Sequence, residues 1–138
     1  SLYIVLEGRV KTELGDRVGA TDVRVAEGAR VDPAASVQPP ALLDAGASVG
    51  PSAVVGPRAV IGPGAVIGER ARVAGSVVLG DCRIEPRAEV ERSVLAPAVV
   101  VGEGARIQPG SVIGEGARIE PGAEVEAGAR VDPGGVAA

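Results

Sequence analysis

The chain repeats a large aliphatic residue every six positions over most of its length. Two intervals in this series, 73–78 and 90–95, are five residues long, and all the others are six. A period of six matches neither the 3.6-residue period of an α-helix nor a heptad, and the recurrent proline and glycine would break a helix. The series consists of Val25, Val31, Val37, Leu43, Val49, Val55, Ile61, Ile67, Val73, Val78, Ile84, Val90, Leu95, Val101, Ile107, Ile113, Ile119, Val125 and Val131.

A second series, mostly of small residues, lies two positions before the large one. Residues two apart on an extended chain point to the same side, so each hexad predicts a short strand with a small and a large residue facing inward, followed by a bend. Pro-Gly pairs, as at 63–64 and 109–110, favour type II turns at these bends. The bend at 38–41 is expected to differ, because Pro40 cannot adopt the positive φ that glycine supplies. The small series is Ala29, Ala35, Ala41, Ala47, Ala53, Ala59, Ala65, Ala71, Ser76, Cys82, Ala88, Ser93, Val99, Ala105, Ser111, Ala117, Ala123 and Ala129.

Segments such as "GARVDPAASV", "GPSAVVGPRAVIGPGAVIG" and "GARIQPGSVIGEGARIEPGAEV" make the chain resemble the hexapeptide-repeat family over residues 23–134. The resemblance implies an all-β fold, a single-stranded left-handed parallel β-helix with three hexads per coil and about six coils. The left hand follows from the resemblance alone, because parallel crossovers in general favour the right hand.

The two five-residue intervals would then lie one coil apart at the same corner, where Ser76 and Ser93 stack with Ser111. We expect these inward hydroxyls to bond to one another or to nearby carbonyls, and no neighbouring base would make them nucleophiles. Cys82 occupies an inward position too, which predicts a buried, inert thiol.

The amino-acid composition argues against several classes of function and partner. The chain has no histidine, so it lacks the commonest general base and the commonest metal ligand, and its single cysteine excludes an internal disulfide. We expect no catalytic residue, metal site or cofactor in this chain. The net charge of −4 argues against nucleic acid or an anionic membrane as partner. No apolar run reaches the roughly 20 residues of a spanning helix, which predicts a soluble, cytoplasmic chain. Asn is absent and Gln occurs only twice; so few thermolabile residues suggest a thermophilic source, and a GC-rich genome is the alternative explanation.

Residues 1–22 depart from the repeat and are expected to form a linker or cap before a β-helix domain at 23–138. Leu2 and Leu6 have helical spacing, which favours a short helix, whereas the residues at 3–5 favour a strand. Both alternatives remain open.

This first segment, followed by "GSVVLGDCRIEPRAEVERSVLAPAVVV", resembles the C-terminal part of sugar-nucleotide pyrophosphorylases of the mannose-1-phosphate guanylyltransferase type. The resemblance implies an N-terminal αβ domain that makes a nucleotide sugar from NTP and a sugar 1-phosphate. The Gly-rich loop and the metal-binding aspartates of that domain are missing here. The chain has no Met and begins at Ser1, so either an initiator was removed or this is a piece of a longer protein.

The expected function is therefore non-catalytic: oligomerisation, docking or regulation of a nucleotidyltransferase. A stand-alone hexapeptide-repeat scaffold is the alternative. An acyltransferase is a third, but acyltransferases of this family use a histidine base, which this sequence does not contain.

Three hexads per coil place every third outward residue in one column. One face then carries an unbroken aliphatic run between Arg24 and Arg130, with Leu79 at its corner. Such a stripe is rarely left in water, which predicts an interface with a second copy, as a dimer or trimer, or with a missing catalytic domain. The competing interpretation is that valine is simply a good strand former, tolerated outside. The candidate interface residues are Leu42, Val60, Val77, Leu79, Val94 and Val112.

The outward residues of the other two faces follow different patterns. One is expected to form a charge ladder that alternates in sign from Arg72 through Glu89 and Arg106 to Glu124. On the third face the valines at 66 and 100 are separated by arginine, so no apolar run forms.

Overall fold

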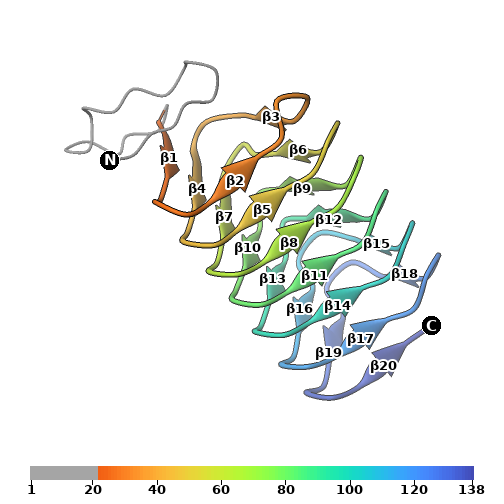
Figure 1. The fold of residues 1–138 in the computed structure, drawn as a ribbon. Helices are drawn as coiled ribbons and strands as arrows, with labels where there is room; N and C mark the ends of the chain where they lie inside the picture. The colour runs from red at the N-terminus through yellow and green to blue at the C-terminus, as the bar shows by residue number, and fades with distance from the viewer. Residues whose placement is uncertain (1–21) are drawn as a thin grey trace.

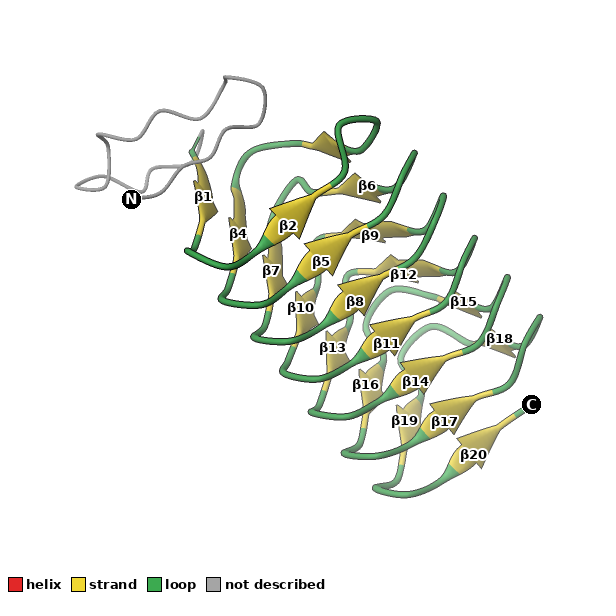
Figure 2. Cartoon of the chain, viewed as in Figure 1, coloured by secondary structure: helices red, strands yellow, loops and turns green. Residues whose placement is uncertain are grey.

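A computed structural model describes residues 22–138, which form a parallel β-solenoid of about six turns (Figure 1). All regular secondary structure in this described part of the chain is β-strand, and no helix occurs in it, as the colouring of Figure 2 shows. The predicted all-β solenoid is confirmed. The expected helix or strand near the N-terminus falls in residues 1–21, outside the described residues.

The strands form three sheets, and each strand pairs in parallel with the strands three before and three after it. Sheet A contains β1 (Val23–Val25), β4 (Ala41–Leu43), β7 (Ala59–Ile61), β10 (Val77–Val78), β13 (Val94–Leu95), β16 (Val112–Ile113) and β19 (Arg130–Val131). Sheet B contains β2 (Arg30–Val31), β5 (Ser48–Val49), β8 (Val66–Ile67), β11 (Arg83–Ile84), β14 (Val100–Val101), β17 (Arg118–Ile119) and β20 (Val136–Ala137). Sheet C contains β3 (Ser36–Val37), β6 (Val54–Val55), β9 (Arg72–Ala74), β12 (Glu89–Glu91), β15 (Arg106–Ile107) and β18 (Glu124–Val125).

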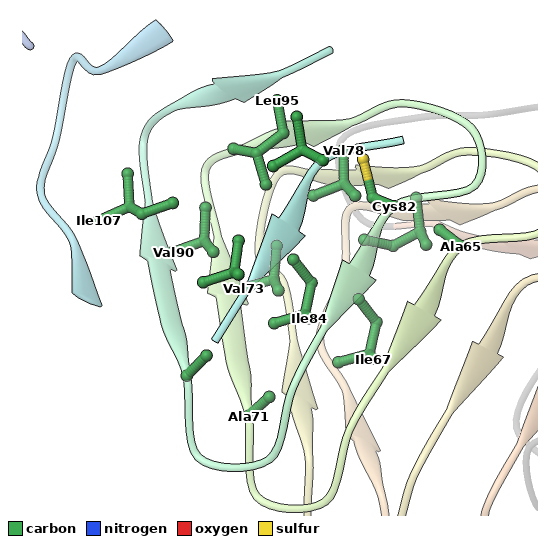
Figure 3. Close-up of a cluster of buried hydrophobic side chains, with 14 of the residues drawn as sticks. Ala65, Ile67, Ala71, Val73, Val78, Cys82, Ile84, Val90, Leu95 and Ile107 are labelled. Atoms are coloured by element: carbon green, nitrogen blue, oxygen red, sulfur yellow. The ribbon is translucent and has the colours of Figure 1, made fainter. Parts of the chain in front are cut away.

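The hexad aliphatics and the small residues before them fill the interior (Figure 3). Ile61 of β7, Ile84 of β11 and Leu95 of β13 are completely buried. The large residues are only half-buried in the first coil, at Val31 and Val37, and in the last, at Val131. Side chains therefore fill the prism, and the surfaces that remain for function are its faces, corners and ends.

The bends show a feature that the sequence analysis did not predict. Glycine supplies the positive φ at many of them, as Gly64 (74°) and Gly110 (83°) do, but seven other residues adopt the same left-handed conformation. The neighbouring coil favours this conformation, because the amide at each of the seven positions donates to a backbone carbonyl of the coil before it. Ala98 N donates to Gly80 O at 3.0 Å, for example. The seven are Ser52, Arg58, Arg70, Asp81, Arg87, Arg92 and Ala98.

One corner is irregular along its length, the corner between sheets C and A. The bend at 38–41 differs as expected, because the Pro39–Pro40 peptide bond is cis, and Gly56–Pro57 in the next coil is cis as well. The two five-residue intervals follow in the next two coils at this same corner, as predicted.

Candidate functional site: an apolar sheet face

The register of sheet A brings the predicted aliphatic residues into one column. Val77 of β10 is directly paired with Val60 of β7 and with Val94 of β13, and the pairing continues in both directions. We call this column, with its members on successive strands, the apolar column. It consists of Leu42, Val60, Val77, Val94 and Val112.

The apolar column lies on the surface. Val60, Val94 and Val112 are 37%, 41% and 42% exposed, whereas Leu42 and Val77 are half-buried. Leu79, in the bend that follows β10, is 37% exposed and extends the apolar surface to the corner. The structure thus brings all six predicted interface residues onto or beside one face, and their burial by a partner stays a prediction.

Charge is arranged at the two ends and the two edges of this face. Arg24 and Arg130 occupy the column positions beyond the aliphatic run. The edge toward sheet B, formed by the bends that follow the strands of sheet A, carries five acidic residues and no basic one among the described bends. We call it the acidic edge; its acids are Glu27, Asp44, Asp81, Glu115 and Asp132.

The edge toward sheet C is mixed in charge. It carries Arg58, Arg92, Glu91 and Glu126, all of them exposed, and the half-buried Asp22 directly before β1. We call it the mixed edge. The sequence analysis missed this difference between the edges, although the signal was present: bend residues 17 or 18 apart stack, so one corner can be read for charge as a face is read for apolarity.

Sheet B, by contrast, carries no continuous apolar column. Its outward residues Val66 and Val100 both pair with Arg83, which separates them. Val66 is as exposed as Val60, at 37%, so valine on the outside is tolerated singly. What distinguishes sheet A is the unbroken run.

Sheet C carries the predicted charge ladder in register. Glu89 pairs with Arg72 on one side and Arg106 on the other, and Arg106 pairs with Glu124. One ion pair forms within the ladder, between Arg106 Nε and Glu89 Oε1 at 3.6 Å. Glu124 Oε2 instead accepts a hydrogen bond from Gln108 Nε2 at 2.6 Å. Both members of the ion pair are about half exposed to solvent, so the ladder contributes little to binding or stability.

The inward hydroxyls donate to nearby carbonyls, as expected, and two of them also accept from the backbone amide of the next serine in the column. Ser76 Oγ accepts from the amide of Ser93 at 3.1 Å, and Ser93 Oγ accepts from the amide of Ser111 at 3.3 Å. The Ser93 hydroxyl lies 2.8 Å from Glu91 O, to which it donates. All three serines are buried, so this column stabilises a corner and presents no nucleophile at the surface.

Cys82 is buried, and its Sγ donates to Ala96 O at 3.1 Å. Burial raises the pKa of the thiol, which favours the protonated, unreactive form. Among residues 22–138 no three potential metal ligands gather into a site. The described part of the chain also contains no helix long and apolar enough to cross a membrane.

Comparison with known proteins places this geometry in context. The model of the GMPPB C-terminal domain family matches residues 37–134, more than half of the chain. No curated protein matches the chain in sequence.

Among solved structures, the chain is similar to a hexapeptide transferase family protein from Anaplasma phagocytophilum, at 20% identity and a TM-score of 0.54, over 81% of this chain and 75% of that one. It is also similar to a mutant of perosamine N-acetyltransferase from Caulobacter crescentus, in complex with CoA and GDP-perosamine. That match has 21% identity and a TM-score of 0.53, over 78% of this chain and 50% of that one. Both matches show the fold alone.

Proposed function

Because the chain belongs to the family of GMPPB C-terminal domains, which are domains of sugar-nucleotide pyrophosphorylases, we propose that it is a non-catalytic assembly domain of a nucleotidyltransferase. The catalytic partner would form a nucleotide sugar from NTP and a sugar 1-phosphate, and this domain would hold copies of the enzyme together. Since that reaction consumes nucleoside triphosphates, the cytoplasm is the compartment in which we expect the assembly to work.

The observation that carries the proposal is the apolar column. Five aliphatic residues on five successive strands span four strand spacings, or about 19 Å, on a flat face. Burying such a column in an interface favours association by about 25 cal/mol for each Å² of apolar surface that is removed from water. Side chains fill the interior of the solenoid, and of its three faces sheet A alone carries an unbroken column of apolar residues among the described strands.

The fold neighbours raise acyl transfer as a second function, but the residues of this chain do not favour it. Acyltransferases with hexapeptide repeats use a histidine as general base, and this sequence contains none. The buried hydroxyls and the buried thiol are already hydrogen-bonded inside the prism. We therefore assign acyl transfer no place in the proposal.

The test changes the apolar column and leaves the fold intact. The double variant Val77→Glu, Val94→Glu puts two charges on outward positions of sheet A. The matched control, Val66→Glu, Val100→Glu, makes the same change on sheet B, where an arginine interrupts the valines. Size-exclusion chromatography with light scattering measures the mass of each, and circular dichroism confirms that each is folded.

We expect an oligomeric wild type, an oligomeric sheet B variant and a monomeric sheet A variant. A wild type that is monomeric, or a folded sheet A variant that keeps its oligomeric state, would contradict the assembly function.

A further inference from the structure

The proposed assembly function leaves open which surface covers the apolar column, and the edges of sheet A bear on that question. The acidic edge carries five acids without a compensating base, whereas the mixed edge carries Arg58 and Arg92 beside Asp22, Glu91 and Glu126. The two edges of the face are therefore different in charge. Any surface that covers the column must also meet both edges.

A flat face can pair with the same face of a second copy in two symmetric ways. If the two-fold axis is perpendicular to the solenoid axis, the copies run antiparallel and each acidic edge lies against the acidic edge of the other copy. If the two-fold axis is parallel to the solenoid axis, the copies run parallel and each acidic edge lies against a mixed edge. Like charges brought together oppose association, so the charges favour the parallel pairing.

The heights of the charges along the solenoid fit the parallel pairing as well. Asp44 follows β4, Arg58 precedes β7, Asp81 follows β10, Arg92 precedes β13 and Glu115 follows β16. These five strands are consecutive in sheet A, so acid and arginine alternate one strand spacing at a time, about 4.8 Å.

In a parallel pair, the height of each arginine therefore falls between the heights of two acids on the facing edge of the second copy. Arg58 of one copy comes between Asp44 and Asp81 of the other, and Arg92 comes between Asp81 and Glu115. The long arginine side chain has the reach to pair with either acid.

From the unbroken apolar column and the unequal edges, we propose that sheet A is the interface of a homodimer with parallel solenoid axes. This inference rests on the proposed assembly function and adds the partner, a second copy of this chain, and its orientation. The apolar columns face each other along the two-fold axis, so each column residue faces its own counterpart. The acidic edge of each copy faces the mixed edge of the other, where Arg58 and Arg92 lie beside Glu91 and Glu126.

Chemical cross-linking distinguishes the two orientations. The variants Leu42→Cys and Val112→Cys each place one thiol at an end of the apolar column, and the wild type, whose Cys82 is buried, is the control. In the parallel dimer each variant alone is cross-linked by a short bismaleimide. In an antiparallel dimer the like thiols are four strand spacings apart, about 19 Å, and only a mixture of the two variants is cross-linked.

A pair of charge reversals tests the edges. Arg58→Glu, Arg92→Glu places acids against the acidic edge and should raise the dimer dissociation constant about tenfold or more at low ionic strength, with a smaller effect in high salt. The matched control is Arg70→Glu, Arg87→Glu: these arginines are also exposed and also at positive φ, but lie at the corner between sheets B and C. It should leave the dissociation constant unchanged.

The outcomes separate this inference from the function on which it rests. Self-cross-linking of each single-cysteine variant together with weakening by Arg58→Glu, Arg92→Glu alone supports the parallel dimer. If the variant Val77→Glu, Val94→Glu is monomeric, the assembly function stands. The parallel dimer is nevertheless overturned if the wild type is a trimer, if cross-links form only in the mixture of the two cysteine variants, or if Arg58→Glu, Arg92→Glu leaves the dissociation constant unchanged. A monomeric wild type overturns both.

Discussion

Replacing Ala98 with glycine should stabilise the solenoid, although the change removes a side chain. Ala98 is exposed and has a φ of 64°, and its amide donates to Gly80 O of the coil before, a bond that glycine retains. The left-handed conformation costs an L-residue about 1–2 kcal/mol, and the added chain entropy of glycine in the unfolded state offsets about 0.5–1 kcal/mol of the relief. The expected net gain in the free energy of unfolding is about 0.5–1 kcal/mol.

The matched control is Ala127→Gly at another exposed bend, where Gly128 already supplies the positive φ, at 74°. Ala127 itself is not left-handed, so only the entropy term remains, and this variant should lose about 0.5–1 kcal/mol. Urea denaturation followed by circular dichroism measures both changes. If the two variants shift the midpoint in the same direction, the neighbouring coil does not impose the strain that we infer at Ala98.

Three further predictions concern the core, the charge ladder and the thiol. Ile67→Asp should unfold the domain. Losing the buried isoleucine side chain costs about 2–5 kcal/mol and burying a carboxylate costs several kcal/mol more, whereas a domain of this size is typically stable by roughly 5–15 kcal/mol. The control Arg70→Asp, at an exposed bend, should leave the melting temperature followed by circular dichroism nearly unchanged. Glu89→Arg would put three positive charges in a row on sheet C and should cost about 0.2–1 kcal/mol at low ionic strength and less in salt, and an unchanged urea midpoint in low salt would argue against the ladder. Cys82 should react with a chromogenic disulfide reagent only on unfolding. Because burial raises the pKa of this thiol in the folded chain, its contribution to stability is complete below the thiol pKa of the unfolded chain and is lost as pH rises toward the thiol pKa of the folded chain. A native thiol that reacts fast would refute the burial.

The sequence predicted the faces of the solenoid well because the hexad period fixes the direction of every side chain. Once three hexads make a coil, the position of Val77 between Val60 and Val94 follows from counting, and the register confirms it. The buried serine column could be predicted in the same way, since the two five-residue intervals are visible in the sequence.

The bends could not be predicted from local preference. Arg70 and Ala98 adopt a conformation that their own side chains disfavour, because hydrogen bonds to the preceding coil decide it. The acidic edge was missed for a related reason: Asp44 and Asp81 are far apart in sequence, and only the stacking of bends brings them onto one edge. The apolar column alone does not identify the partner that covers it, and the partner of sheet A is inferred from the charges at its two edges, which only the stacking of the bends reveals.

The most direct test of the account is the mass of the unmodified chain by sedimentation equilibrium over a wide range of concentration. The chain has a mass of 13.6 kDa, and the account predicts a reversible dimer of twice that mass, about 27 kDa. The dissociation constant of this dimer should rise when glutamate replaces Val77 and Val94 of the apolar column, or Arg58 and Arg92 of the mixed edge. A single species of 13.6 kDa at every concentration would show that sheet A faces water and would contradict the assembly of this domain through that face.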